Sequence, residues 1–272
     1  MSRVLRRLLR HRGLLATLVQ RELKARYRGS VLGFVWSLVN PLALILVYTF
    51  VFSTIFTPRD RLVVDFGPYG LFLATGVIPW IWLQVSWVEG SASLLANAGL
   101  IRKAAFPAEL LPVVSVLSNL VHLLLALPIL ILAFAAMALF GVQTSFSWAT
   151  ASLLPLAIVV QLPGVAGVAI GLSALNVHFK DVRDLLANAL TLLFFLTPIL
   201  YTLRTLEPFP WVHAAVAWNP LTPFVTVYQE IVFYGRWPSP ELWLLMVAVS
   251  LVLWILGTWL FERLSETLVE AV

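Results

Sequence analysis

No Asp, Glu, Lys or Arg interrupts the stretch from Leu110 to Phe179, which reads LLPVVSVLSNLVHLLLALPILILAFAAMALFGVQTSFSWATASLLPLAIVVQLPGVAGVAIGLSALNVHF. An uncharged run of this length corresponds to two membrane-crossing helices, because one crossing takes about 20 apolar residues. The segment 141–147 (GVQTSFS) has the Gly and small polar residues of a turn and divides the run. We therefore expect spans at about 110–140 and 148–174.

Four more apolar runs are predicted to cross the membrane outside this stretch. Two precede it and two follow it, at about 33–56, 69–95, 185–203 and 242–261. A further apolar segment, 208–236, contains Pro220 and Pro223 and therefore does not favour one continuous helix. Two short re-entrant helices in the outer leaflet fit it better than a seventh span, although a kinked full span remains an alternative. The predicted fold is an all-α membrane protein with six transmembrane helices.

Composition supports a membrane protein and excludes several other classes. The chain is 61% hydrophobic and 11% charged, with a mean hydropathy of +0.95, whereas a soluble domain carries about 25% charged residues. There is no cysteine, which excludes disulfides and thiol catalysis. The net charge of +5 does not indicate a nucleic-acid partner, because half of the 18 Lys and Arg residues precede position 29. These residues form a basic arm in front of the first span.

The distribution of basic residues predicts the orientation of the chain. With the N-terminus inside, fourteen basic residues fall in inner segments: nine in the arm, and Arg102, Lys103, Lys180, Arg183 and Arg263. The outer segments hold four, namely Arg59, Arg61, Arg204 and Arg236. This bias places both termini in the cytoplasm.

Residues 1–32 are predicted to be a cytoplasmic unit, and residues 33–272 the transmembrane domain. Within the first unit, apolar residues at Leu14, Leu15, Leu18 and Leu23 alternate with charged ones at a helical spacing. Such a helix lies along the inner membrane surface. It serves either as a topology signal and surface anchor, or as a docking surface for a cytoplasmic partner.

The first inner loop, Asn97 to Glu109, is short, basic and amphipathic. The loop combines the apolar residues Leu100, Ile101 and Phe106 with the basic residues Arg102 and Lys103. A partner protein can bind a surface of this kind.

Two acids and one glycine pair stand out inside the apolar runs. Glu89, near the inner end of the second span, is interpreted as reaching the lipid headgroups, and Glu230 as a second acid at the membrane. Gly167 and Gly171 form a GxxxG pair that favours close helix packing, either within or between subunits.

The chemistry of an enzyme is not found in the sequence. There is no phosphate-binding GxxxxGK[ST] loop and no HExxH, and the four histidines are scattered. We therefore expect no catalytic residues, metal or cofactor in this chain, and any energy for transport has to come from another protein.

Several segments, taken together and in order, resemble a known family. They are RELKARYRGSVLGFVWSLVNP from Arg21, LIRKAAFPAE from Leu100, LNVHFKDVRD from Leu175, TPILY from Thr197 and WNPLTP from Trp218. The chain resembles the ABC-2 type permeases that export polysaccharides over nearly its whole length. His178 and Phe179 stand where an Arg-Tyr pair is common in that family, which is a small departure.

The resemblance implies a homodimer of six-span subunits bound to two ATP-binding subunits, with ATP and Mg on those partners. It implies an interface helix from Gly13 to Gly29, with Arg21, Glu22, Lys24, Arg26 and Tyr27. It implies a coupling helix seated in an ATPase cleft, with Asn97, Leu100, Ile101, Arg102, Lys103, Phe106 and Pro107. Candidate channel-lining residues from the first, second and fifth spans are Trp36, Tyr48, Trp82, Phe194, Phe195 and Tyr201. Candidate outer-gate residues are Trp218, Asn219 and Pro220.

The expected function is therefore export of a lipid-linked polysaccharide, most of all O-antigen, across the bacterial inner membrane. An ABC-2 exporter of teichoic acid, capsule, lipid or drug is the first alternative. A membrane scaffold without a transport role is the second.

Overall fold

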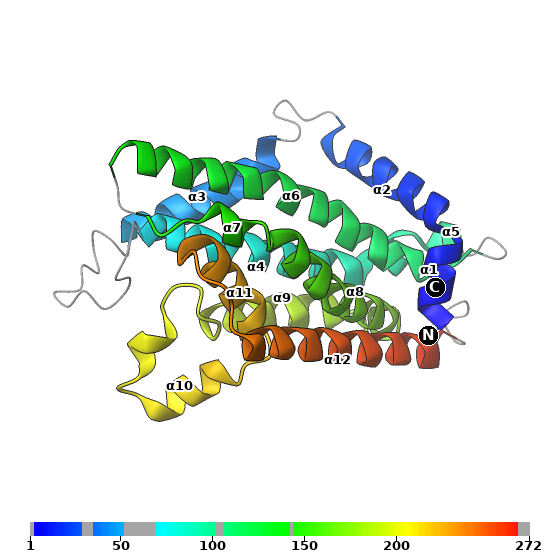
Figure 1. Cartoon of the computed structure of the whole chain (residues 1–272). Helices are drawn as coiled ribbons and strands as arrows, with labels where there is room; N and C mark the ends of the chain where they lie inside the picture. Colours follow the sequence, from blue (N-terminus) through cyan, green and yellow to red (C-terminus); the bar gives the residue numbers. More distant parts are fainter. Residues whose placement is uncertain (1–2, 29–34, 52–68, 102–105, 142–143, 266–272) are drawn as a thin grey trace.

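The structure is a computed structural model that describes residues 3–28, 35–51, 69–101, 106–141 and 144–265. Within these ranges the chain is helical, and no strand occurs (Figure 1). In chain order the helices are α1 (Arg3–Arg10), α2 (Arg12–Tyr27), α3 (Trp36–Phe50), α4 (Tyr69–Ala96), α5 (Ala98–Ile101), α6 (Leu110–Leu139), α7 (Trp148–Ala151), α8 (Leu154–His178), α9 (Val182–Phe195), η3 (Leu203–Leu206), α10 (Pro210–Ala217), α11 (Thr222–Tyr228), η4 (Gln229–Phe233) and α12 (Pro240–Leu264). The all-helical expectation is confirmed for this part of the chain.

Helix α4 is the centre of the bundle and packs against α6 and α8, with α3, α9 and α11 also in contact. In its most apolar eighteen-residue stretch 78% of the residues are buried, against 22% in α6 and in α12. Trp80 and Leu83 of α4 are almost fully enclosed. The outer helices instead keep apolar residues exposed, such as Leu132 on α6 and Leu244 on α12. Exposed apolar side chains on long helices are what a lipid environment requires.

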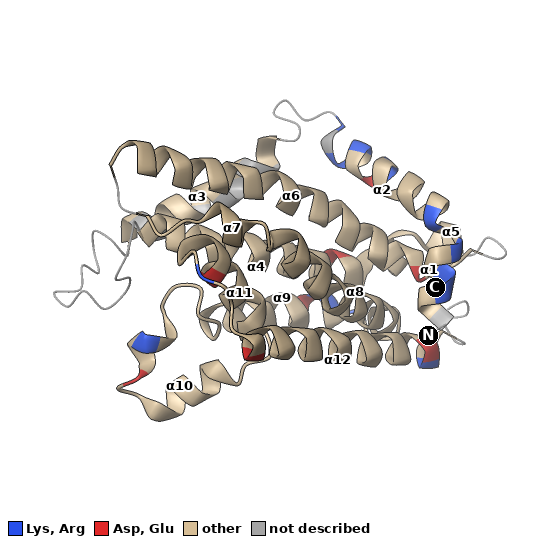
Figure 2. Ribbon diagram, viewed as in Figure 1, with Lys and Arg blue, Asp and Glu red and all other residues tan. Residues whose placement is uncertain are grey.

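Four helical segments are long and apolar enough to cross a membrane: Tyr69–Ala96, Leu110–Leu139, Trp148–His178 and Pro240–Leu264. They correspond to the predicted second, third, fourth and sixth spans, with ends that differ by a few residues. Lys, Arg, Asp and Glu lie mainly toward the two ends of the bundle and leave its middle nearly uncharged (Figure 2). These helices confirm the membrane class of the fold.

The first and fifth predicted spans have less helix than expected. Residues 52–56 of the first lie outside the described residues, and α3 covers Trp36–Phe50. The fifth was expected to run through 185–203, but α9 ends at Phe195 and residues 196–199 form turns. Pro198 accounts for this end, because proline has no N–H for the helix ladder and disfavours a helical residue before it.

Glycines bring α8 and α12 into direct backbone contact. A Cβ added to Gly171 would lie 2.8 Å from the Cα of Gly257, and one added to Gly167 would collide with the backbone of Trp254. The N–H of Gly164 donates to Ser250 Oγ at 2.8 Å across the same seam. The predicted GxxxG packing is confirmed, and it joins two helices of one chain.

The basic arm folds into two helices, α1 and α2, which meet at His11. Val4 and Leu8 of α1 are buried, and Leu15 and Leu18 of α2 pack against the same cluster at the α5 end of the bundle. Figure 1 places α1 beside α5 and the end of α12, while α2 runs along α6. The arm is therefore part of the folded domain.

The proline-containing segment 208–236 forms α10, α11 and the π-helical turn η4. Helix α11 and η4 pack against α4, whereas α10 extends away from the bundle with η3 (Figure 1). Short helices replace a continuous one here, as the prolines predict. Their depth in the membrane remains a prediction.

Candidate functional site

The loop predicted to couple to an ATPase folds against the end of the bundle. Asn97 ends α4, and its Nδ2 donates to the carbonyl of Ser93 at 3.0 Å. Ile101 is 8% exposed and lies in the core cluster, while Leu100 and Phe106 are half-buried at its edge. Pro107 is also half-buried. Leu100 and Phe106 are thus the apolar side chains that remain partly open to a partner; Arg102 and Lys103 lie outside the described residues.

A cluster of three polar side chains ties α2 to the bundle. Arg26 Nη2 lies 2.5 Å from Glu89 Oε2, and its Nη1 donates to Asn119 Oδ1 at 2.9 Å. Asn119 Nδ2 in turn donates to Glu89 Oε2 at 2.8 Å. We name these three residues the α2–α4–α6 cluster. Each member bonds to both others, so the helices are held in one register.

The cluster gives Glu89 a partner within the chain. The sequence favoured a carboxylate reaching the headgroups, and the structure pairs it with Arg26 of the predicted interface helix while 37% of the Glu89 side chain stays exposed. Its depth in the membrane remains a prediction. Asn119 was not predicted as a site residue, because it is uncharged and the third span contains no charged residue. An Asn inside an apolar span is itself a signal, since a buried amide needs partners.

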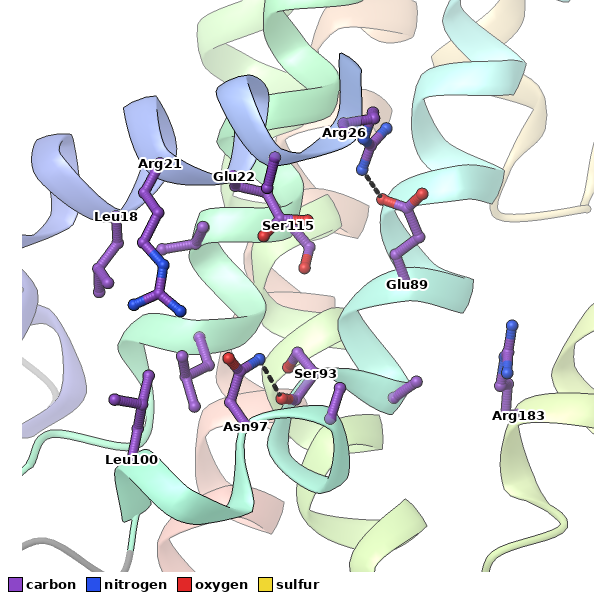
Figure 3. Close-up of a pocket in the computed structure, with 15 residues that line it drawn as sticks. Leu18, Arg21, Glu22, Arg26, Glu89, Ser93, Asn97, Leu100, Ser115 and Arg183 are labelled. Carbon is purple, nitrogen blue, oxygen red and sulfur yellow. Dashed lines mark hydrogen bonds and ion pairs between the residues drawn. The ribbon is translucent and has the colours of Figure 1, made fainter. Parts of the chain in front are cut away.

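A half-open cleft of about 530 Å³ separates α2 from the floor formed by α4, α5 and α6. Figure 3 shows Arg21 directed from α2 toward the side of Asn97 and Leu100, with Arg183 standing on the far side beyond Glu89. Arg21, Glu22 and Arg26 of the predicted interface helix thus border the same cleft as Asn97 and Leu100 of the predicted coupling helix. The described residues that line it are Leu18, Arg21, Glu22, Ala25, Arg26, Glu89, Ala92, Ser93, Ala96, Asn97, Leu100, Leu111, Val114, Ser115 and Arg183.

One described member of the predicted interface helix lies outside this cleft: Lys24 is exposed on α2 and is not among the lining residues. Tyr27 belongs to α2, but its side chain is not described. The helix therefore presents Arg21, Glu22 and Arg26 to the cleft and Lys24 elsewhere.

A second ion pair, which the sequence did not predict, anchors α1. Arg7 Nη1 lies 3.3 Å from Glu109 Oε1, and the Glu109 side chain is 2% exposed while that of Arg7 is 61% exposed. Glu109 directly precedes α6, at the end of the predicted coupling loop. The pair joins residues 102 positions apart in the chain, so neither local spacing nor helix periodicity signals it.

At the other end of the bundle, the TPILY and WNPLTP segments meet. Asn219 Nδ2 donates to the carbonyl of Leu196 at 3.0 Å and lies 3.2 Å from Thr197 Oγ1. Gln229 Nε2 donates to the carbonyl of Pro198 at 2.8 Å. Tyr69 Oη donates to the carbonyl of Leu200 at 2.8 Å. The turns after α9 are therefore held by three separate elements.

Of the predicted outer-gate residues, only Asn219 makes these contacts. Trp218 is 87% exposed, and Pro220 is exposed as well. Trp218 thus projects from the turn that Asn219 anchors.

The predicted channel-lining residues divide into enclosed and exposed ones. Trp82 is 2% exposed and donates from Nε1 to the carbonyl of Val116 at 3.2 Å. Phe194 is 7% exposed and packs edge-to-face on Trp80, 5.9 Å between ring centroids. Both therefore pack inside one chain.

The others lie closer to the surface. Trp36 and Phe195 are about half exposed, and Tyr201 is half-buried, with its Oη donating to the carbonyl of Phe195 at 2.7 Å. Tyr48 is in α3, and its side chain is not described. Phe195 belongs to an exposed apolar stripe on α9 that also contains Leu185 and Leu192, which were not predicted as site residues; all three are more than half exposed, as is Leu196 directly after the helix. Its signal is the helical spacing of these residues.

Among the described residues, no group of three or more His, Asp or Glu side chains could hold a metal ion. The absence of a cofactor in the chain remains a prediction.

Known proteins resemble the chain over its whole length. The O-antigen export system permease protein RfbA of Myxococcus xanthus is 35% identical over 100% of both chains. A protein of the same name from Klebsiella pneumoniae is 30% identical over 94% of both chains, and the polysialic acid transport protein KpsM of Escherichia coli is 21% identical over 79% of both. The family model described as ABC-2 type transporter matches residues 13–233. The chain therefore belongs to the ABC-2 type transporter family.

Proposed function

We propose that this chain is the permease subunit of an ATP-driven exporter that moves lipid-linked O-antigen polysaccharide across the bacterial inner membrane. The observation that carries the proposal is the full-length similarity to a permease named for O-antigen export, at 35% identity. The chain has no phosphate-binding loop of its own, so ATP and Mg are assigned to a separate ATPase.

The working assembly is a homodimer with two ATPase subunits. In it α3 and α9, with the residues next to them, complete the first and fifth of six spans. Both termini are cytoplasmic, because the predicted inner segments contain fourteen basic residues and the outer ones four. The orientation puts α1, α2 and α5 on the ATPase side and α10 and α11 on the outer side.

Coupling runs through the cleft between α2 and α5. The coupling helix offers Leu100 and Phe106 to the ATPase, and Arg102 and Lys103 supply positive charge beside them. ATP binding closes the ATPase pair and favours one of two arrangements of this end. The α2–α4–α6 cluster transmits the displacement to the transmembrane helices.

The polysaccharide path is assigned to the contact between two copies of the chain. Each copy exposes apolar faces on α3, with Leu46 and Phe50, and on α9, with Leu192 and Phe195. Trp36 and Phe195 are the aromatic residues best placed to stack on sugar rings. Trp82 and Phe194 do not line the path themselves but pack beneath the residues that do, since both are enclosed within one chain.

The outer gate is assigned to α10 and α11, which enter the outer leaflet as a re-entrant pair. Asn219 fixes their connecting turn to the end of α9, and Trp218 and Pro220 are exposed at that turn. A shift of α9 would therefore carry the gate with it.

Deletion and complementation test the function and its coupling. Loss of the chain should remove O-antigen from the cell surface, detected by immunoblot of intact cells, while lipid-linked polysaccharide accumulates inside. Arg102→Glu or Phe106→Ala should keep ATP hydrolysis but abolish export. Normal surface O-antigen in the deletion strain would refute the O-antigen assignment, and wild-type export by both variants would refute the coupling assignment.

Capsular polysaccharide is the second candidate cargo. The observation that favours it is the more distant similarity to KpsM, a protein named for polysialic acid transport. Teichoic acid, lipid or drug export would use the same architecture. If a well-folded preparation from native membranes brings no ATPase with it, the scaffold alternative takes precedence.

A further inference from the structure

Helix α1 buries its apolar side in the protein itself. Val4 is 2% exposed and Leu8 is 9% exposed, and both belong to the cluster that contains Ile101 and Leu110. Arg7 adds its ion pair with Glu109. The helix is thereby attached to both ends of the segment that joins α5 to α6.

The opposite side of α1 is strongly positive. Arg6 and Arg10 are exposed, as is Arg12 at the start of α2, and 61% of the Arg7 side chain is accessible. No acidic residue occurs before Glu22, and no ion pair among the described residues involves Arg6 or Arg10. Figure 2 shows the blue ribbon segments of α1 next to α5.

A bilayer is a poor partner for this surface. An amphipathic helix binds a membrane through insertion of its apolar face together with attraction of its basic residues to anionic lipids, and only the second contribution is left to α1 because its apolar face is covered by the core cluster. Leu9, 57% exposed, is the only apolar residue of α1 that remains largely accessible. An acidic protein surface satisfies the arginines without requiring an apolar face.

We propose that α1 is a third docking element for the ATPase, beside the interface and coupling helices, and that Arg6 and Arg10 contact an acidic patch on that subunit. The inference rests on the proposed function. Because Arg7 binds Glu109, a displacement of the docked ATPase would pull directly on the start of α6.

Charge reversal tests the contact in the complete complex. The double variant Arg6→Glu/Arg10→Glu should retain about tenfold less ATPase on the tagged chain purified from native membranes, because like charges facing each other oppose binding. Arg59→Glu/Arg61→Glu changes the charge equally in a predicted outer segment and should retain the wild-type amount. Size-exclusion profiles of both variants should match the wild type, since Arg6 and Arg10 are exposed.

The outcomes separate this inference from the proposed function. If the wild-type chain retains the ATPase and the α1 variant retains as much, α1 is not a docking element and the proposed function stands. If the wild-type chain retains no ATPase, both the α1 inference and the proposed function are contradicted.

Site-specific cross-linking gives a second measurement. The chain has no cysteine, so Arg10→Cys can be labelled with a benzophenone maleimide in inside-out membrane vesicles and photolysed. Adducts that contain ATPase peptides are expected, whereas adducts with lipid alone would overturn the inference.

Discussion

Arg26 in α2 and Glu89 in α4 form an ion pair, with 2.5 Å between Nη2 and Oε2, that fixes the predicted interface helix to the most buried helix of the bundle. Asn119 of α6 bonds to both partners and is itself 3% exposed. The contact thus joins the surface helix α2 directly to the core helices α4 and α6.

A double-mutant cycle measures this connection. Arg26→Gln and Glu89→Gln should each lower the melting temperature in detergent, and the double variant should lose less than their sum. We expect a coupling energy of about 1 kcal/mol or less, because water screens a pair whose side chains are 24% and 37% exposed.

Lys24→Gln provides the matched control, since Lys24 is a charged residue of the same helix that lies outside the cleft. Its effect should add to that of Glu89→Gln. If the effects of Arg26→Gln and Glu89→Gln on stability were strictly additive as well, the ion pair would contribute nothing to stability.

Asn219 should hold the outer gate through its amide donor. Asn219→Asp keeps the Oδ1 that accepts from the Leu221 N–H at 2.9 Å, but it removes the Nδ2 bond to Leu196. We expect a loss of about 1–3 kcal/mol in unfolding free energy, because a carboxylate would then face a carbonyl. Thermal unfolding checks stability, and surface O-antigen checks export.

Trp218→Ala is the comparison for that variant. Trp218 is 87% exposed, so its removal should change stability by no more than about 0.5 kcal/mol. If Asn219→Asp is equally harmless, the turn after α9 does not depend on Asn219.

Long uncharged runs predicted most of the bundle, because lipid allows few alternatives to an apolar helix of sufficient length. The packing of α1 against the bundle depends on contacts that are distant in the chain. Arg7 and Glu109, for example, are 102 positions apart, and no local sequence pattern predicts such a pair. The early end of α9 does have a local signal, since Pro198 lies inside the expected fifth span.

The contacts of the candidate site could not be predicted from the sequence. The family resemblance assigned Arg26 and Asn97 to two separate segments, and the structure brings both to one cleft; their role in coupling remains a prediction. It could not show that Trp82 and Phe194 would be enclosed, because a run rich in apolar residues does not tell the lipid-facing side of a helix from the protein-facing side.

The α8–α12 seam should tolerate no added side chain at Gly171. In Gly171→Ala the new Cβ would lie 2.8 Å from the Cα of Gly257 and 3.0 Å from its carbonyl oxygen. Both neighbours are backbone atoms of a helix and cannot rotate away. We expect a destabilisation of about 1–3 kcal/mol, measured by thermal unfolding in detergent.

Gly13→Ala is the control for the seam, because no atom lies within 4 Å of a Cβ at that position. Alanine there should be neutral or slightly stabilising, since it favours helix over glycine. Equal melting temperatures for both variants would contradict the close packing of α8 on α12.

The exposed stripe on α9 should lie at the contact between two copies of the chain. Leu192 and Phe195 are 67% and 52% exposed, and the chain has no cysteine of its own. Leu192→Cys and Phe195→Cys should therefore give a species of twice the subunit mass when membranes are treated with a short bifunctional maleimide. Leu244→Cys on α12, where the native leucine is 69% exposed, should stay monomeric because lipid covers that face. Preferential cross-linking at Leu244→Cys would instead move the subunit contact to α12 and remove α9 from the polysaccharide path.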